Sequence, residues 1–178
     1  EQRRWVEKHT SGNVFVSPFD GVLYARRFAD WFKPALFFWW ESLDFSSYDI
    51  VVSSSHSFSA KSVIVPTDVF HISYIHTPPR YLYNEYNETQ WTRHPLVKFL
   101  LEPVFSWMRK KDYAAAQRPD VVIVNSKTVQ ERVKRYYGRD SLVIYPPACM
   151  PTRTVPFGRK PEYYLSVSRL VRQKGIDL

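Results

Sequence analysis

Short apolar runs recur along this chain, and longer segments with helical patterns separate them. Each run is rich in β-branched or aromatic residues and is bounded by Ser, Pro or Asp, which is typical of strands buried on both faces of a parallel sheet. The runs are Asp49–Val52, Val63–Val65, Ile72–Ile75, Val121–Val124 and Leu142–Tyr145, with a sixth, Tyr163–Val167, after a proline-rich stretch. Strands that alternate with helices predict an α/β fold with a doubly wound parallel sheet.

The first helix predicted from the apolar pattern covers Leu96–Ala116. Pro103 lies inside this segment and predicts a kink or a break into two pieces. The residues expected on its apolar face are Val97, Leu101, Val104, Phe105 and Met108.

The second predicted helix is Lys127–Tyr137. Asn125 or Ser126 is the expected N-cap, and Gly138 stands where a helix-ending glycine belongs. The expected apolar stripe consists of Val129, Val133 and either Tyr136 or Tyr137.

The length and composition limit the number of domains and the kinds of partner. Of 178 residues 44% are hydrophobic, which suffices for the core of one α/β domain but not for two complete ones. With 25 Lys+Arg against 17 Asp+Glu, the net charge of +8 favours anionic partners such as nucleotide phosphates, anionic lipids or nucleic acid. The lone Cys149 excludes an intramolecular disulfide and a multi-cysteine zinc site, and fits a reducing compartment.

No secretory leader and no membrane-spanning helix are expected. The longest apolar stretch, Pro34–Trp40, is far shorter than the ~20 residues that a spanning helix needs. Within it, the aromatic cluster Phe37–Trp40 is best explained by core packing, and docking at a membrane interface is the alternative.

Polar side chains follow four of the predicted strands. Ligands of open parallel sheets bind beyond the carboxyl ends of the strands, so a ligand site is predicted at this edge. The residues concerned are Ser53, Ser54, Ser55 and His56 after the first run, His76, Thr77 and Arg80 after the third, Asn125 and Ser126 after the fourth, and Ser168 and Arg169 after the sixth.

Each of these groups also has a structural interpretation. The three serines 53–55 can form a turn through local side-chain bonds to the backbone. Asn125 and Ser126 can cap the following helix, which is the interpretation we favour for that pair. His76 can be a structural histidine, and Arg80 an ordinary surface residue.

A basic loop follows the sixth run. Arg169 and Lys174 flank it, and a helix is expected to start near Gly175. Two cations beside a helix N-terminus can hold a diphosphate, whereas the alternative is a solvated basic loop.

Several motifs resemble the family 4 glycosyltransferases, and most closely the bacterial mannosyltransferases of O-antigen and exopolysaccharide assembly. The resemblance covers about residues 5–178. The motifs are YDIVVSSSH at 48–56, IHTPPRYLY at 75–83, PDVVIVNS at 119–126 and SRL followed by KG at 168–175. The combination of SSSH with HTPPRY is specific, whereas the SRL and KG element is common to many enzymes of the same fold.

The resemblance implies a GT-B fold, in which the active site lies between two Rossmann-like domains. Residues 1–145 would form the N-terminal, acceptor-side domain, and the proline-rich residues 146–161 would be the interdomain linker. Residues 162–178 would begin the C-terminal domain that binds the nucleotide sugar. The first strand with its Gly-rich loop and the acidic donor-site motif of the family are not found, and Ser62 stands where relatives often have Gly.

The resemblance also implies roles for the polar residues. Arg169 and Lys174 would hold the donor diphosphate and stabilise the leaving group, and His76 would be the catalytic residue beside the transferred sugar. The residues expected on the acceptor or sugar side are His56, Ser55, Arg80 and Ser126. Enzymes of this family retain the anomeric configuration and generally need no metal, so no metal and no cofactor are expected.

The predicted function is transfer of a hexosyl group, preferably mannose, from a nucleoside diphosphate sugar to a carbohydrate or lipid-linked acceptor. We expect a cytoplasmic protein, with peripheral contact at the inner face of the membrane as an option, and no sugar transfer by residues 1–178 alone. One alternative is a catalytically inactive acceptor-side domain. The other, a basic α/β module that binds nucleic acid, is disfavoured because the aromatic residues follow strand and helix patterns and do not form a stacking platform.

Overall fold

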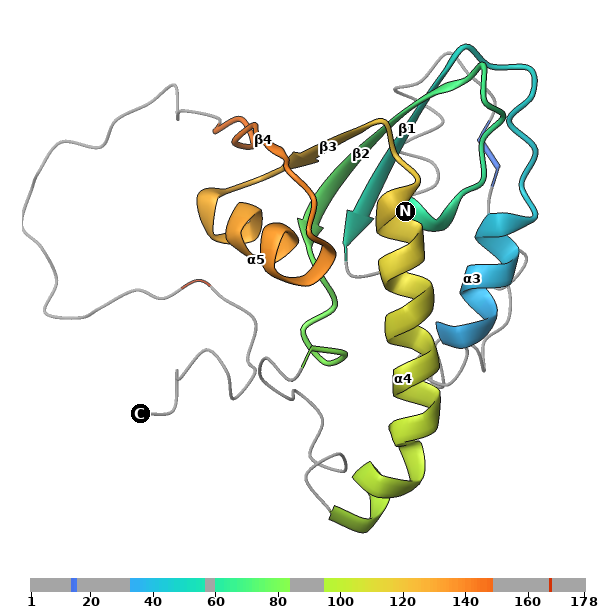
Figure 1. Cartoon of the computed structure of the whole chain (residues 1–178). Coiled ribbons are helices and arrows are strands. Elements are labelled where there is room, and N and C mark those ends of the chain that lie inside the picture. Colours follow the sequence, from blue (N-terminus) through green and yellow to red (C-terminus); the bar gives the residue numbers. More distant parts are fainter. Residues whose placement is uncertain (1–13, 16–32, 57–59, 84–94, 149–166, 168–178) are drawn as a thin grey trace, which may run out of the picture.

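The computed structural model describes residues 14–15, 33–56, 60–83, 95–148 and 167 of the chain (Figure 1). Within these residues a parallel sheet has the strand order β1-β2-β3-β4. Its strands are β1 (Ile50–His56), β2 (Phe70–Thr77), β3 (Val121–Val124) and β4 (Leu142–Val143). The helical elements are α3 (Lys33–Glu41), the short 3-10 helix η2 (Ala60–Ser62), α4 (Pro95–Gln117) and α5 (Lys127–Tyr137). The predicted Rossmann-like α/β fold with a parallel sheet is confirmed.

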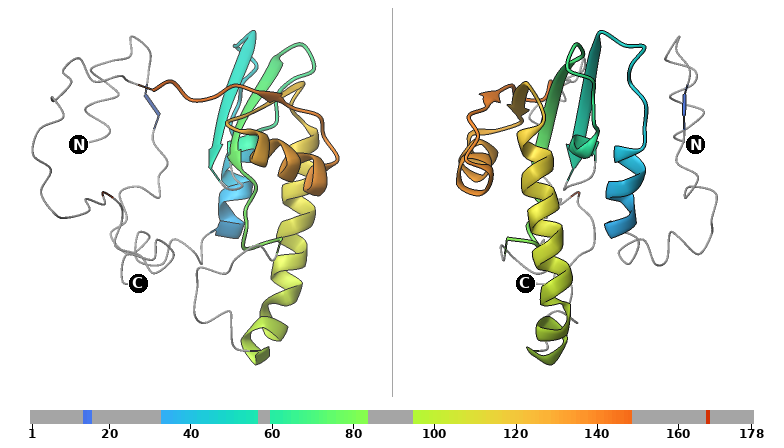
Figure 2. Two further views of the ribbon diagram at one scale, coloured as in Figure 1. Left: turned by 90° about the vertical axis from the view of Figure 1, so that its left-hand side faces the viewer. Right: turned by 45° about the vertical axis from the view of Figure 1, so that its right-hand side comes forward.

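The three described helices pack against the same face of the sheet (Figures 1 and 2). On β1, residues alternate between exposed and buried, and the buried set is Val51, Ser53 and Ser55. Trp40 of α3 packs near Val51, whereas α5 packs over β2 and β3. The opposite face carries exposed apolar side chains, among them Val52, which is 67% exposed.

One predicted strand, Val63–Val65, is not a strand. Neighbouring parallel strands need a crossover connection of about a dozen residues, and Val63–Val65 belongs to the connection between β1 and β2. Val63 is buried against Val51 and Val69, so its apolar character comes from the core and not from a place in the sheet.

Three strands have other limits than predicted. β2 extends two residues beyond the predicted Ile72–Ile75 at each end, so His76 and Thr77 lie within the strand. β1 does not end at Val52 but continues through the three serines to His56, so the turn interpretation of Ser53–Ser55 is wrong. The fifth predicted strand, Leu142–Tyr145, is reduced to Leu142–Val143. The sixth run, Tyr163–Val167, lies outside the described residues except for Val167, which is not in a strand.

The helix α4 passes through Pro103 as one element, so the predicted break into two pieces does not occur. Its predicted apolar face is confirmed at Phe105 and Met108, which pack against Phe37 of α3. Val104, also expected on that face, is 43% exposed.

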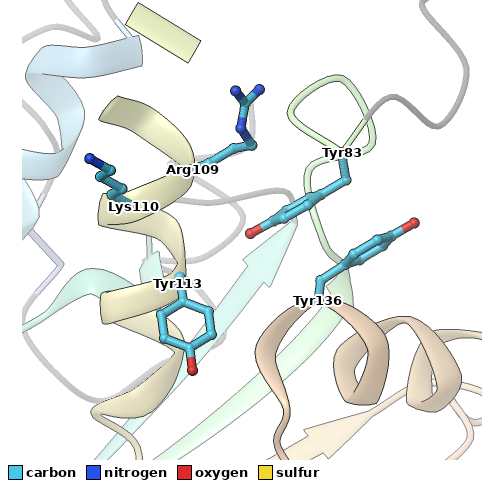
Figure 3. Close-up of a pocket in the computed structure, with 5 residues that line it drawn as sticks. All are labelled: Tyr83, Arg109, Lys110, Tyr113 and Tyr136. Atoms are coloured by element: carbon cyan, nitrogen blue, oxygen red, sulfur yellow. The ribbon is translucent and has the colours of Figure 1, made fainter. Parts of the chain in front are cut away.

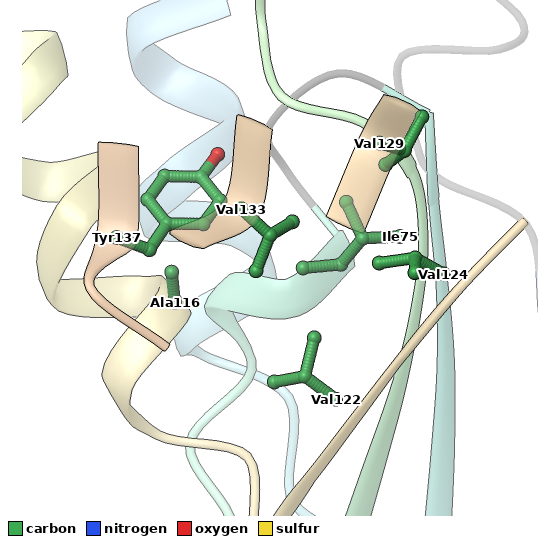
Figure 4. Close-up of a cluster of buried hydrophobic side chains, with 7 residues drawn as sticks. All are labelled: Ile75, Ala116, Val122, Val124, Val129, Val133 and Tyr137. Atoms are coloured by element: carbon green, nitrogen blue, oxygen red, sulfur yellow. The ribbon is translucent and has the colours of Figure 1, made fainter. Parts of the chain in front are cut away.

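The helix α5 agrees with the prediction at both ends. The Ser126 hydroxyl accepts a bond from the backbone N–H of Val129, and Gly138 ends the helix with a left-handed φ of 66°. Tyr137, and not Tyr136, completes the buried stripe. The core that this helix covers (Figure 4) consists of Ile75, Ala116, Val122, Val124, Val129, Val133 and Tyr137.

A buried polar network lies beside this core. Lys61 of η2 and Asp112 of α4 form an ion pair of 2.5 Å, and both side chains are fully buried. Tyr83 and Tyr137 each donate a hydroxyl hydrogen bond of 2.8 Å to the second carboxylate oxygen, Oδ2 of Asp112. A buried carboxylate is tolerated only when donors satisfy it, and here three side chains do so.

We expect Asp112→Ala to destabilise the protein by about 3–5 kcal/mol, because it leaves a buried ammonium group and two buried hydroxyls without their acceptor. Chemical denaturation monitored by circular dichroism measures this loss. The matched control is Asp140→Ala, which breaks the exposed Lys134–Asp140 pair and should leave the denaturation midpoint unchanged. Equal effects of the two variants would contradict a structural role for the buried network.

Candidate active site

The carboxyl ends of β1 and β2 bring two histidines together. The strands are parallel, and His56 at the end of β1 is paired with Thr77 at the end of β2. The His56 and His76 rings lie with their centroids 6.3 Å apart. The prediction that these two imidazoles occupy the same edge of the sheet is confirmed.

His76 has a defined position within this pair. Its Nε2 is 3.1 Å from the hydroxyl oxygen of Ser54, and its ring lies edge-on to Tyr74 at 5.1 Å. Tyr74 is itself held, because its hydroxyl donates to the carbonyl oxygen of Ile144. Two side chains from adjacent strands therefore orient the imidazole.

The cluster formed by Ser54, His56, Tyr74 and His76, called here the strand-end cluster, lies on the sheet face opposite the described helices. Ser54 and His56 are exposed and His76 is half-buried. Hydroxyl and imidazole groups that reach solvent at one edge can exchange hydrogen bonds with a ligand rich in hydroxyl groups. The cluster thus has the chemistry of a sugar-binding or proton-handling site.

The sequence places Ser54 among the polar residues of the predicted edge but assigns the sugar-side role to Ser55, and Tyr74 is not named because it lies within a predicted strand. In a strand, however, only alternate residues share a face. Ser55 points to the helix-covered face, where it is buried and its hydroxyl has no hydrogen-bond partner among the described residues. Alternation counted back from His56 would have selected Ser54.

Two other predicted site residues, Ser126 and Arg80, are described by the structure but do not belong to the strand-end cluster. Ser126 serves as the cap of α5, and its hydroxyl also donates to the Asn125 side chain at 3.2 Å. Arg80 is exposed and lies in the turn that follows Pro78 and Pro79, both of which are buried. Arg169 and Lys174 lie outside the described residues.

Neither a metal cluster nor a membrane span is found among the described residues. No group of three or more His, Cys, Asp or Glu residues there could hold a metal ion. No helix in the same part of the chain is both long and apolar enough to cross a membrane.

Residues 3–150 match the family model of Glycosyltransferase Family 4. This match covers most of the chain, so the protein belongs to that family of glycosyltransferases. The domain that carries the strand-end cluster falls within the matched residues. No curated protein and no solved structure gave a significant match.

A third histidine, His71, lies away from the strand-end cluster and has a structural role. Its Nε2 is 2.9 Å from the Ser53 hydroxyl, and its backbone N–H donates to Oδ2 of Asp120. Burial lowers the pKa of His71, Asp120 opposes that shift, and the nearby Arg118 reinforces it. His71 is therefore held as a neutral imidazole inside the sheet.

The lowered pKa predicts a pH-dependent stability. Protonation of His71 favours the unfolded chain, so its contribution is complete above about pH 6.5 and is lost as the pH falls through the folded-state pKa. We expect the melting temperature to decrease from pH 7.5 to 5.5, and this slope to be smaller in His71→Gln. Thermal melts at several pH values measure it.

The control for this experiment is Ser53→Ala, which removes the hydrogen bond to His71 but leaves the imidazole buried. Because burial is the main cause of the shift, this variant should be less stable at every pH while keeping the wild-type slope. A His71→Gln slope equal to that of the wild type would contradict the assignment.

Proposed function

We propose that the protein transfers a hexosyl group, preferably mannose, from a nucleoside diphosphate sugar to a carbohydrate or lipid-linked acceptor, with retention of configuration. Membership of the glycosyltransferase family supports the class of reaction. The observation that carries the proposal for this domain is the strand-end cluster, in which Ser54 and Tyr74 orient His76 beside His56.

In this proposal His76 is the catalytic residue and hydrogen-bonds the transferred sugar. His56 and Arg80 contribute to the acceptor side, and Ser54 holds the His76 ring. Arg169 and Lys174 neutralise the charge that develops on the diphosphate as the glycosidic bond breaks. No metal and no cofactor take part in this scheme.

The proposed domain arrangement follows the same logic. Residues 1–145 form the acceptor-side domain, residues 146–161 the linker, and residues 162–178 the start of the domain that binds the nucleotide sugar. The donor would then lie between the strand-end cluster of the first domain and the basic loop of the second.

The test is steady-state transfer kinetics of the whole protein with nucleoside diphosphate hexoses as donors. We expect His76→Ala to lower kcat by about 100-fold or more, because a group aimed at the reacting sugar is lost. Arg169→Ala and Lys174→Ala should each cost roughly 2–4 kcal/mol of transition-state stabilisation, or about 30- to 1000-fold in rate.

The matched control is Arg172→Ala, which removes a cation from the same loop at a position we expect to face solvent. It should have little effect on kcat, and thermal melts should show that all four variants fold. If Arg172→Ala is as damaging as Arg169→Ala, the loop is a diffuse basic surface and the donor assignment is wrong. Full activity of His76→Ala would refute the catalytic role of the strand-end cluster.

We also propose that the protein contacts an anionic membrane peripherally, through the first turns of α4. Leu96, Phe99 and Leu100 are 60%, 76% and 65% exposed, and their spacing of i, i+3 and i+4 places them on one side of the helix. Figure 1 shows this end of α4 (yellow-green) far from the sheet. An exposed apolar stripe on a protein of net charge +8 suits an anionic lipid surface.

Sedimentation with vesicles of phosphatidylglycerol and phosphatidylethanolamine tests this contact. Phe99→Glu should weaken binding about tenfold or more, since burying one large apolar side chain is worth about 1.5–3 kcal/mol. Leu142→Glu is the matched control, because Leu142 is 61% exposed but lies on β4. A similar loss in both variants would show that binding follows net charge and not the apolar stripe.

A further inference from the structure

A pocket of about 320 Å³ lies between α4, α5 and the turn after β2. It is lined by Tyr83, Arg109, Lys110, Tyr113 and Tyr136 (Figure 3), and contains none of the strand-end residues. Three tyrosines and two basic residues line it, and in Figure 3 the charged ends of Arg109 and Lys110 point away from the tyrosine rings. The hollow is shallow and open to solvent, which suits a sugar unit held at the surface and not an enclosed small molecule.

Two of the aromatic rings are held rigidly. Tyr83 and Tyr136 are stacked with centroids 4.3 Å apart and an interplanar angle of 16°. The Tyr83 hydroxyl donates to Asp112, which is paired with the buried Lys61. Burial and the Asp112 carboxylate raise the pKa of Tyr83, so this hydroxyl stays protonated and keeps its hydrogen bond. This side of the pocket is therefore formed before any ligand arrives.

The other side of the pocket belongs to α4 and offers adaptable groups. Arg109 donates to the carbonyl oxygen of Leu82 and pairs with Glu102, which fixes its guanidinium group. Lys110 is exposed and makes no ion pair within the part of the chain that the structure describes. Tyr113, one turn further along, is 50% exposed and presents a ring surface to solvent.

We propose that this pocket binds a hexopyranose that carries a carboxylate or a phosphate group. The C–H face of a pyranose packs against aromatic rings, here above all Tyr113 beside the fixed tyrosine pair. The acidic group pairs with Lys110, three residues before Tyr113 on α4, whose exposed side chain turns toward the bound sugar. Tyr83 lies seven residues after His76, joined to it by the turn through two buried prolines. As a subsite for an anionic acceptor chain the pocket rests on the proposed function, whereas as a binding site it does not.

Isothermal titration calorimetry with the 178-residue protein tests the binding directly. The probes are digalacturonate, glucose 6-phosphate, neutral maltose and uridine monophosphate. We expect at least one of the two acidic sugars to bind, with maltose and the nucleotide much weaker. Which acidic sugar binds more tightly distinguishes a carboxylate-bearing ligand from a phosphorylated one.

Variants locate the site. Tyr113→Ala should weaken the binding of the acidic sugar about tenfold and Lys110→Ala about threefold, with recovery in Lys110→Arg. The matched controls are Tyr48→Ala and Lys134→Ala, an exposed tyrosine and an exposed lysine outside the pocket, which should bind like the wild type. Circular dichroism checks that each variant folds.

Three results would overturn the inference. They are binding of maltose as tight as that of the acidic sugars, binding of the nucleotide alone, and wild-type affinity in both Tyr113→Ala and Lys110→Ala. Failure of the proposed function gives a different pattern, because a protein without transferase activity would still bind the acidic sugar and lose that binding in Tyr113→Ala.

Discussion

The buried carboxylate of Asp112 joins the segments of the described structure that pack around it. It lies buried in α4 and accepts from Lys61 of η2, from Tyr83 in the turn after β2 and from Tyr137 of α5. The ammonium of Lys61 also lies 5.4 Å from the Tyr137 ring centroid, and burial lowers its pKa against the opposing effect of Asp112. Because an unpaired charge in the core is costly, these bonds favour the arrangement in which all four segments meet at Asp112.

This arrangement links the strand-end cluster to the aromatic pocket. His76 lies at one end of the segment 76–83 and Tyr83 at the other, with Pro78 and Pro79 buried between them. Ser54 orients the first end and Asp112 holds the second. The same short segment therefore connects the two sites.

Part of the site could be predicted because polar side chains at the ends of parallel strands must share an edge. His56 and His76 were found in this way, and the structure brings their rings to 6.3 Å. Ser54 has no predicted role because β1 ends four residues beyond the predicted end at Val52, so the alternation of faces does not enter the prediction. Tyr74 lies inside the predicted strand Ile72–Ile75, where an aromatic residue is expected to belong to the core. The pocket was missed altogether, since Tyr83, Tyr113 and Tyr136 are distant in sequence and follow ordinary helix and turn patterns.

Local rules in the sequence determined the elements that need no distant partner. Ser126 and Gly138 limit α5 through bonds to their own helix, and the run Val121–Val124 is a strand as its composition predicts. Only the tertiary structure decided whether an apolar run is a strand or a core-facing connection, as with Val63–Val65. It also decided which charged side chain is buried. Lys61 looks like a surface residue in the sequence. It can be buried only because Asp112, 51 residues away, meets it there and compensates for the lost hydration.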